Sequence, residues 1–240
     1  MTDLWAVRNV DVVAELLREH IYLSLVPTVL GLVIALPIGL LVRERHRARA
    51  AVVSAAAIAF TIPSLALLVI VPAVIGTSII DPLNLVVALT IYSVSLQVRT
   101  VLESLDAVSS RVREAATAVG FSSVRRTVQV DLPLTIPVLA AGTRVVAVTN
   151  VAMVSVGAVL GVGALGELFT RGYQRDYPEQ ILTGIVLIML LAVVYDRLIA
   201  LIARALTPWT RVGGDGSRRR LARLLRQTQL GQLEEASDAR

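Results

Sequence analysis

Apolar residues in this chain occur in long uncharged blocks, not at the spacing of an amphipathic helix or a half-buried strand. Residues 21–42 carry no charge and are long enough to cross a hydrocarbon core of about 30 Å as a helix. Residues 82–104, 132–166 and 180–204 form three further blocks, in which charged residues are few. The pattern therefore predicts an all-α transmembrane protein.

The block at residues 50–80 is different, because it is uncharged but contains Pro63 and Pro72. It is too long for one straight span and too short for two spans with a loop. We expect one kinked span, with the surplus forming a re-entrant or interfacial piece. The chain then has five spans: an extracytoplasmic segment 1–20, a transmembrane domain 21–206 and an Arg-rich cytoplasmic tail 207–240.

The arginines indicate the orientation of these spans. Segments 43–49, 105–131 and 205–240 hold 15 of them, whereas 1–20, 81 and 167–179 on the other side hold 4. Arginine concentrates in loops that stay inside the cell. We expect the N-terminus outside and the C-terminus in the cytoplasm.

The composition supports a protein embedded in lipid, and it limits the kinds of partner to be expected. The chain of 240 residues is 55% hydrophobic with a net charge of +5 and no cysteine. Its arginines flank apolar blocks, so membrane lipid is the expected partner of the positive charge, and nucleic acid is not. The first residues include several acids and no cleavage site, so no signal peptide is expected.

The longest internal polar stretch, the loop 105–131, carries the most specific motif. Glu114, Ala115 and Ala116 are followed by Gly120, and the stretch ends in Val130-Asp131-Leu132-Pro133. Residues 111–119 favour a short helix with a shallow alanine face, which Gly120 can end by adopting a positive φ. Pro133 suits the first turn of the next helix.

This spacing resembles the EAA motif of the permeases of binding-protein-dependent ABC importers, with Val130 in place of isoleucine. The resemblance implies a type I importer permease domain whose coupling helix, between spans three and four, docks on a cytoplasmic ABC ATPase dimer. It further implies an extracytoplasmic substrate-binding protein and a second permease subunit, either a paralogue or a second copy. The family also implies a place in the inner (cytoplasmic) membrane of a bacterial cell. The implied ATPase-coupling residues are Glu114, Ala115, Ala116, Gly120, Val130, Leu132 and Pro133.

Two further segments resemble the permeases that import glycine betaine, choline, carnitine and related osmoprotectants. They are residues 60–68, with Thr61, Pro63 and Ser64, and residues 161–169. As a broken helix and a glycine-rich segment, they fit a translocation path or gate. A simple packing kink and close helix packing are the alternatives. The second segment holds Gly161, Gly163 and Gly166, but has Val162 and Ala164 where the family has other residues, so we expect a positive φ at Ala164 to be unfavourable.

Arg144 is the single charge in its span, and an intramembrane charge costs at least about 2.5 kcal/mol. We expect it to pair with Asp196 or to hold two permease subunits together. Helix counting places Arg144 about 10 Å further from the cytoplasm than Asp196, which weakens the pairing. Aromatic residues make up only 4%, with no cluster that would cage a quaternary amine, so selectivity is expected in the binding protein.

Other classes fit less well. His20 and His46 are expected outside the spans and no His-Glu-x-x-His motif occurs, so no catalytic residue, metal or cofactor is predicted. An ion-coupled secondary carrier would leave the EAA motif unexplained. A permease for methionine or another amino acid remains the nearest alternative. The segment 218–226 is either an interfacial helix or a solvated tail.

Overall fold

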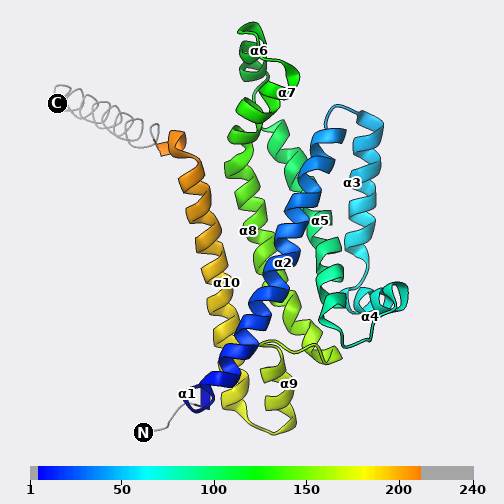
Figure 1. Cartoon of the computed structure of the whole chain (residues 1–240), viewed down its shortest axis with the longest axis vertical. Helices are drawn as coiled ribbons and strands as arrows, with labels where there is room; N and C mark the ends of the chain where they lie inside the picture. The colour runs from blue at the N-terminus through cyan, green and yellow to red at the C-terminus, as the bar shows by residue number, and fades with distance from the viewer. Residues whose placement is uncertain (1–4, 212–240) are drawn as a thin grey trace, which may run out of the picture.

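In the computed structural model, which describes residues 5–211, every regular element is a helix (Figure 1). The first half of the chain forms α1 (Trp5–Arg8), α2 (Val10–Val42), α3 (His46–Thr61), α4 (Ser64–Ile75) and α5 (Pro82–Asp106). The second half forms α6 (Ser110–Ala118), α7 (Ser123–Arg126), a π-helical turn (Thr127–Asp131), α8 (Leu132–Gly157), a 3₁₀ turn (Ala158–Leu160), α9 (Glu167–Gln174), α10 (Pro178–Leu206) and a last 3₁₀ turn (Pro208–Arg211).

Four stretches are each long and apolar enough to span a membrane. They are α2, α5, the run from Ser123 to Leu160 that contains α8, and α10. The pair α3 and α4 makes a fifth span if the two helices count as one. The all-α transmembrane fold predicted from the apolar blocks is therefore confirmed.

The helix α2 begins at Val10, well before the span predicted from residue 21. Its first turns are polar but still amphipathic, because Leu16 and His20 face the protein while Glu15 and Arg18 face outward. His20, which was expected outside the spans, is part of this helix. Its side chain is fully buried, and Nε2 lies 2.9 Å from the carbonyl oxygen of Val151 in α8.

The helix α5 lies at the centre of the bundle, in contact with α2, α3, α4 and α8. Gly31 and Gly39 of α2 let its backbone approach Ser93 and Val101 of α5 so closely that an added Cβ would clash. Small residues at helix crossings are the usual means of close packing in membranes. Two buried apolar clusters, one near each end of the bundle, pack around α5.

A sharp break, not a mild kink, separates α3 from α4, whose axes differ by 101°. Pro63 cannot continue the helix, and Ile62 and Pro63 both take extended backbone angles. The hydroxyl group of Tyr92 in α5 donates a hydrogen bond to the freed carbonyl of Ile62. The helix α4 therefore turns away from α3 as the separate piece expected from the length of the block (Figure 1).

The elements sort to two ends of the bundle (Figure 1). One end carries α6, α7, the turn between α2 and α3, and the end of α10. We call it the α6 end. The opposite end, called the α9 end, carries α1, α4 and α9. The two predicted sites thus lie at opposite ends, and most of the predicted tail 207–240, including segment 218–226, falls outside the described residues.

Candidate functional site

The short helix α6 protrudes at one extreme of the molecule (Figure 1). It runs from Ser110 to Ala118, close to the predicted 111–119. Gly120 follows with a φ of 89°, and the N–H groups of Gly120 and Phe121 donate to the carbonyls of Thr117 and Ala116. This is the Schellman arrangement in which glycine ends a helix. The motif glycine therefore sets the direction in which the chain leaves α6.

The outward face of α6 differs from the face expected from sequence. Glu114, Ala115 and Ala118 are exposed, but Ala116 is only 8% exposed. Helical spacing places Ala116 on the same side as Arg113, toward the body of the chain. The shallow surface that another protein can approach is therefore built on Ala115 and Ala118, with Glu114 beside them, and Ala116 packs inward.

The end of the motif forms the joint between α6 and the long helix α8. Val130 and Asp131 close the π-helical turn, and Leu132 and Pro133 form the first turn of α8. Asp131 is fully buried and accepts a 2.8 Å hydrogen bond from Nη1 of Arg43, the residue that follows α2. The sequence marked this position only as a variable residue of the motif, so its ion pair was not predicted.

The glycine-rich segment lies at the α9 end, between α8 and α9. Gly161 has a φ of 84°, and Gly166 directly precedes α9. Ala164 also has a positive φ, 62°, and is fully buried, so this alanine adopts the conformation that was expected to be unfavourable for it. Its N–H donates a 2.8 Å hydrogen bond to Oε2 of Glu19 in α2, which helps to hold the strained residue.

Glu19 also explains why residue 163, the second glycine of this segment, has no side chain. A Cβ on Gly163 would lie 2.7 Å from Oε2 of Glu19, so a larger residue would displace the carboxylate. Glu19 was missed in the sequence because it precedes the predicted first span. A cavity of about 350 Å³ lies beside this loop and is lined by Gly161, Gly163, Glu167, Arg171 and Gln174 among others.

The other predicted gate residues lie at the break between α3 and α4. The hydroxyl of Thr61 donates to the carbonyl of Ile58 within its own helix, and Ser64 begins α4. Leu67 and Leu68 of α4 belong to the same buried apolar cluster as Ala164. The two predicted gate segments, a hundred residues apart in sequence, therefore share one core region.

A chain of buried polar side chains ties α2, α5 and α8 together between the two ends. The amide Nδ2 of Asn150 donates 2.8 Å hydrogen bonds to the hydroxyl groups of Thr28 and Ser93. Nε2 of Gln97 donates to the carbonyl of Thr28 at 2.9 Å. Because these donors have partners inside the bundle, the buried polar side chains fix α2, α5 and α8 relative to one another.

Arg144 and Asp196 form an ion pair, with 2.6 Å between Nη2 and Oδ1. The offset of about 10 Å expected between them is absent. Arg144 lies ~18 Å from the start of α8 and Asp196 ~15 Å from the end of α10, at about 1.5 Å per residue. Their side chains are 39% and 28% exposed and border a cavity of about 450 Å³ on the α8–α10 surface.

Taken together, the apolar helices, the protruding helix with its shallow alanine face and the strained loop at the opposite end define a membrane-embedded subunit of a larger transport assembly. Within residues 5–211, no group of three or more His, Asp or Glu is placed to hold a metal ion.

Comparison with known proteins agrees with this class. Residues 28–208 match the family described as the binding-protein-dependent transport system inner membrane component, and the chain belongs to this family. It is a multi-pass membrane protein and an ABC importer permease.

Individual relatives match this chain over most of their own length. The glycine betaine/carnitine/choline transport system permease of Bacillus subtilis is 30% identical over 79% of this chain and 86% of its own. The osmoprotectant import permease of Salmonella typhimurium is 32% identical over 83% of this chain and 94% of its own. Among solved structures, the MetNI methionine ABC transporter in an inward-facing conformation matches with a TM-score of 0.70 and 26% identity, covering 81% of this chain and 96% of that chain.

Proposed function

We propose that this chain forms the transmembrane path for uptake of osmoprotectants, namely quaternary amines such as glycine betaine, choline, carnitine and proline betaine. The proposal rests on the exposed α6 with its EAA motif, in a chain whose relatives are named as permeases for glycine betaine, carnitine, choline or osmoprotectants. A separate ATPase subunit hydrolyses ATP, and this chain supplies no catalytic group to that reaction.

In this proposal, α6 is the coupling helix. Glu114, Ala115 and Ala118 form the surface that meets the ATPase, because they are exposed at the tip of the molecule. Gly120, Val130, Leu132 and Pro133 fix the angle between that surface and α8. Ala116 supports the helix from its inner side.

The gate lies at the α9 end and includes Thr61, Pro63 and Ser64 at the break between α3 and α4 and the segment holding Gly161, Gly163 and Gly166. Leu67 and Leu68 of α4 share one buried cluster with Ala164 of that segment. A strained, positive-φ loop held by one carboxylate is the kind of element that can adopt two arrangements. The α9 end then faces the extracytoplasmic binding protein, which delivers the substrate, and the α6 end faces the cytoplasm.

Two permease subunits line one path in this assembly, either two copies or a pair of paralogues. The half-exposed pair Arg144–Asp196 supports this arrangement, because charges at this depth are unfavourable against lipid. We therefore place the α8–α10 surface toward the second subunit or a water-filled path. Purification with the cognate ATPase should yield two membrane subunits per two ATPases, and an active complex with one membrane subunit would contradict it.

The substrate class is tested by uptake into proteoliposomes that contain the complete transporter and its binding protein. We expect ATP-dependent uptake of radiolabelled choline or glycine betaine, with competition by carnitine and none by methionine. Uptake of methionine instead would favour the nearest alternative, which the likeness to the methionine transporter also suggests. Uptake that continues without ATP but follows an ion gradient would indicate a secondary carrier.

A further inference from the structure

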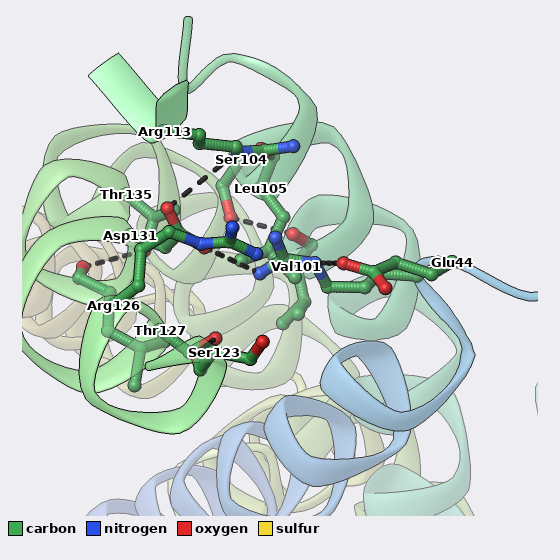
Figure 2. Close-up of polar contacts among 12 residues, drawn as sticks. Glu44, Val101, Ser104, Leu105, Arg113, Ser123, Arg126, Thr127, Asp131 and Thr135 are labelled. Atoms are coloured by element: carbon green, nitrogen blue, oxygen red, sulfur yellow. Dashed lines mark hydrogen bonds and ion pairs between the residues drawn. The ribbon is translucent and has the colours of Figure 1, made fainter. Parts of the chain in front are cut away.

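A buried ion cluster lies at the base of α6 (Figure 2). Its centre is Asp131, whose side chain has no exposed surface. Arg43, which is only 8% exposed, contacts one carboxylate oxygen, with 2.8 Å from Nη1 to Oδ2. Arg113 of α6 approaches the other oxygen. One carboxylate thus lies between the end of α2, the start of α8 and the coupling helix.

The contact with Arg113 is incomplete. Nε of Arg113 lies 3.7 Å from Oδ1 of Asp131, and both atoms are buried without a hydrogen-bond partner. Nη2 of Arg113 instead donates to the carbonyl of Leu105 near the end of α5. A shift of about 1 Å would close the gap to the usual length of a charge-assisted hydrogen bond. Buried unpaired polar atoms are costly, so a hydrogen bond between these two groups would satisfy both atoms.

The backbone at this point is also unusual. Asp131 is the last residue of the π-helical turn Thr127–Asp131, which joins α7 to α8. Such turns are rare and occur frequently at functional sites. The carboxylate therefore sits where the helix geometry changes, between the short helices at the tip and the long helix in the membrane.

We propose that Asp131 is a positioning residue that passes movement of the coupling helix to α2 and α8 through Arg113 and Arg43. The inference rests on the proposed docking of α6 on an ATPase. When the ATPase presses α6 inward, the Arg113–Asp131 hydrogen bond closes and the base of α6 moves with the ends of α2 and α8 as one body. Without the carboxylate, α6 still docks, but its movement is not passed on.

The experiment is a double-mutant cycle on the reconstituted transporter, with Asp131→Asn, Arg113→Met and the combined variant. The readout is the number of substrate molecules transported per ATP hydrolysed, beside basal hydrolysis and folded yield. We expect each single variant to assemble, keep basal hydrolysis and lower the transport ratio about 10-fold, and the combined variant to be no worse than either. Arg47→Met, an exposed arginine on α3 at the same end, is the matched control and should keep the wild-type ratio.

Two outcomes overturn the proposal. The first is a normal ratio in the single variants, whatever their yield, since Asp131 would then act on stability alone. The second is independent, additive losses, since the two residues would then not act through each other. If Asp131→Asn does not fold, Arg113→Met decides alone, because that side chain is 27% exposed and its loss leaves the Arg43–Asp131 pair intact.

The failure of the proposed function is distinguishable from these outcomes. If Ala115→Arg on the outer face of α6 leaves substrate-stimulated hydrolysis unchanged, α6 is not a coupling helix and both proposals fall. If Ala115→Arg abolishes stimulation while Asp131→Asn and Arg113→Met transport normally, only the role of Asp131 is wrong.

Discussion

The charged pair Arg144–Asp196 illustrates how single residues constrain this protein within the membrane. Without Arg144, Asp196 would keep only a long 4.0 Å contact with Arg197, and without Asp196 the charge of Arg144 would lose its partner within the membrane. Removing one partner of such a pair is therefore more damaging than removing both. We therefore expect Arg144→Ala to lower folded yield as well as uptake, and Arg144→Ala combined with Asp196→Ala to recover part of the yield. Fluorescence-detected size exclusion in mild detergent measures the yield. Normal yield and normal uptake in Arg144→Ala would dismiss any role for the pair.

The hydrogen bond from Ala164 to Glu19 gives a second prediction. A non-glycine residue in the left-handed region carries about 1–2 kcal/mol of strain, so Ala164→Gly should raise the melting temperature of the detergent-solubilised protein. Glu19→Ala removes the acceptor and should lower both melting temperature and uptake. Glu15→Ala, exposed one turn earlier on α2, is the control and should change neither. Equal effects of Glu19→Ala and Glu15→Ala would show that the hydrogen bond does not hold the loop.

These residues also show what the sequence could and could not predict. Arg144 stood out because a charge is rare in an apolar block. Whether it reaches Asp196 could not be predicted, because that depends on where α10 ends. Glu19 and His20 were missed because hydropathy alone placed the span after them, although the helix begins at Val10. The role of Asp131 was invisible because its two arginines come from distant segments, and only the fold brings them together.

At the scale of the elements, the long helices follow from the apolar blocks, whereas the angles between short pieces do not. The prolines indicated a break in residues 50–80 but not its angle of 101°, nor that Tyr92 of α5 would satisfy the freed carbonyl of Ile62. Likewise, the EAA spacing placed a short helix correctly, but the expected outer face held both Ala115 and Ala116, and only one of the two lies outside. That choice depends on the contact of α6 with the body of the chain, which places Ala116 inside.

The end of α6 provides a prediction at this scale. Gly120 has a φ of 89°, and a Cβ added to it would meet no atom within 4 Å, so the constraint is conformational and not steric. Gly120→Val should strain the turn and mis-aim α6, with loss of uptake and preserved membrane insertion. Gly120→Asn should retain more activity, because asparagine tolerates the left-handed conformation better. Equal uptake in the valine and asparagine variants would contradict a backbone role for this glycine.

For the whole molecule, the separation of α6 and α9 to opposite ends makes the orientation testable. Because the chain has no cysteine, single cysteines report their own position. A cysteine at His46, exposed at the α6 end, should react only with reagents that enter the cell. A cysteine at Tyr173, 84% exposed on α9, should react with impermeant reagents from outside. Labelling of position 46 from outside would reverse the proposed topology.

The central claim is that α6 couples this permease to an ATPase, and one measurement tests it most directly. Ala115→Arg places a bulky charge on the exposed alanine face, so it should block docking without disturbing the core. In liposomes with the ATPase and substrate-loaded binding protein, we expect this variant to lose both stimulated ATP hydrolysis and uptake. Ala50→Arg, the same change at an exposed alanine of α3, should keep both. Wild-type stimulation and uptake in Ala115→Arg would contradict the account.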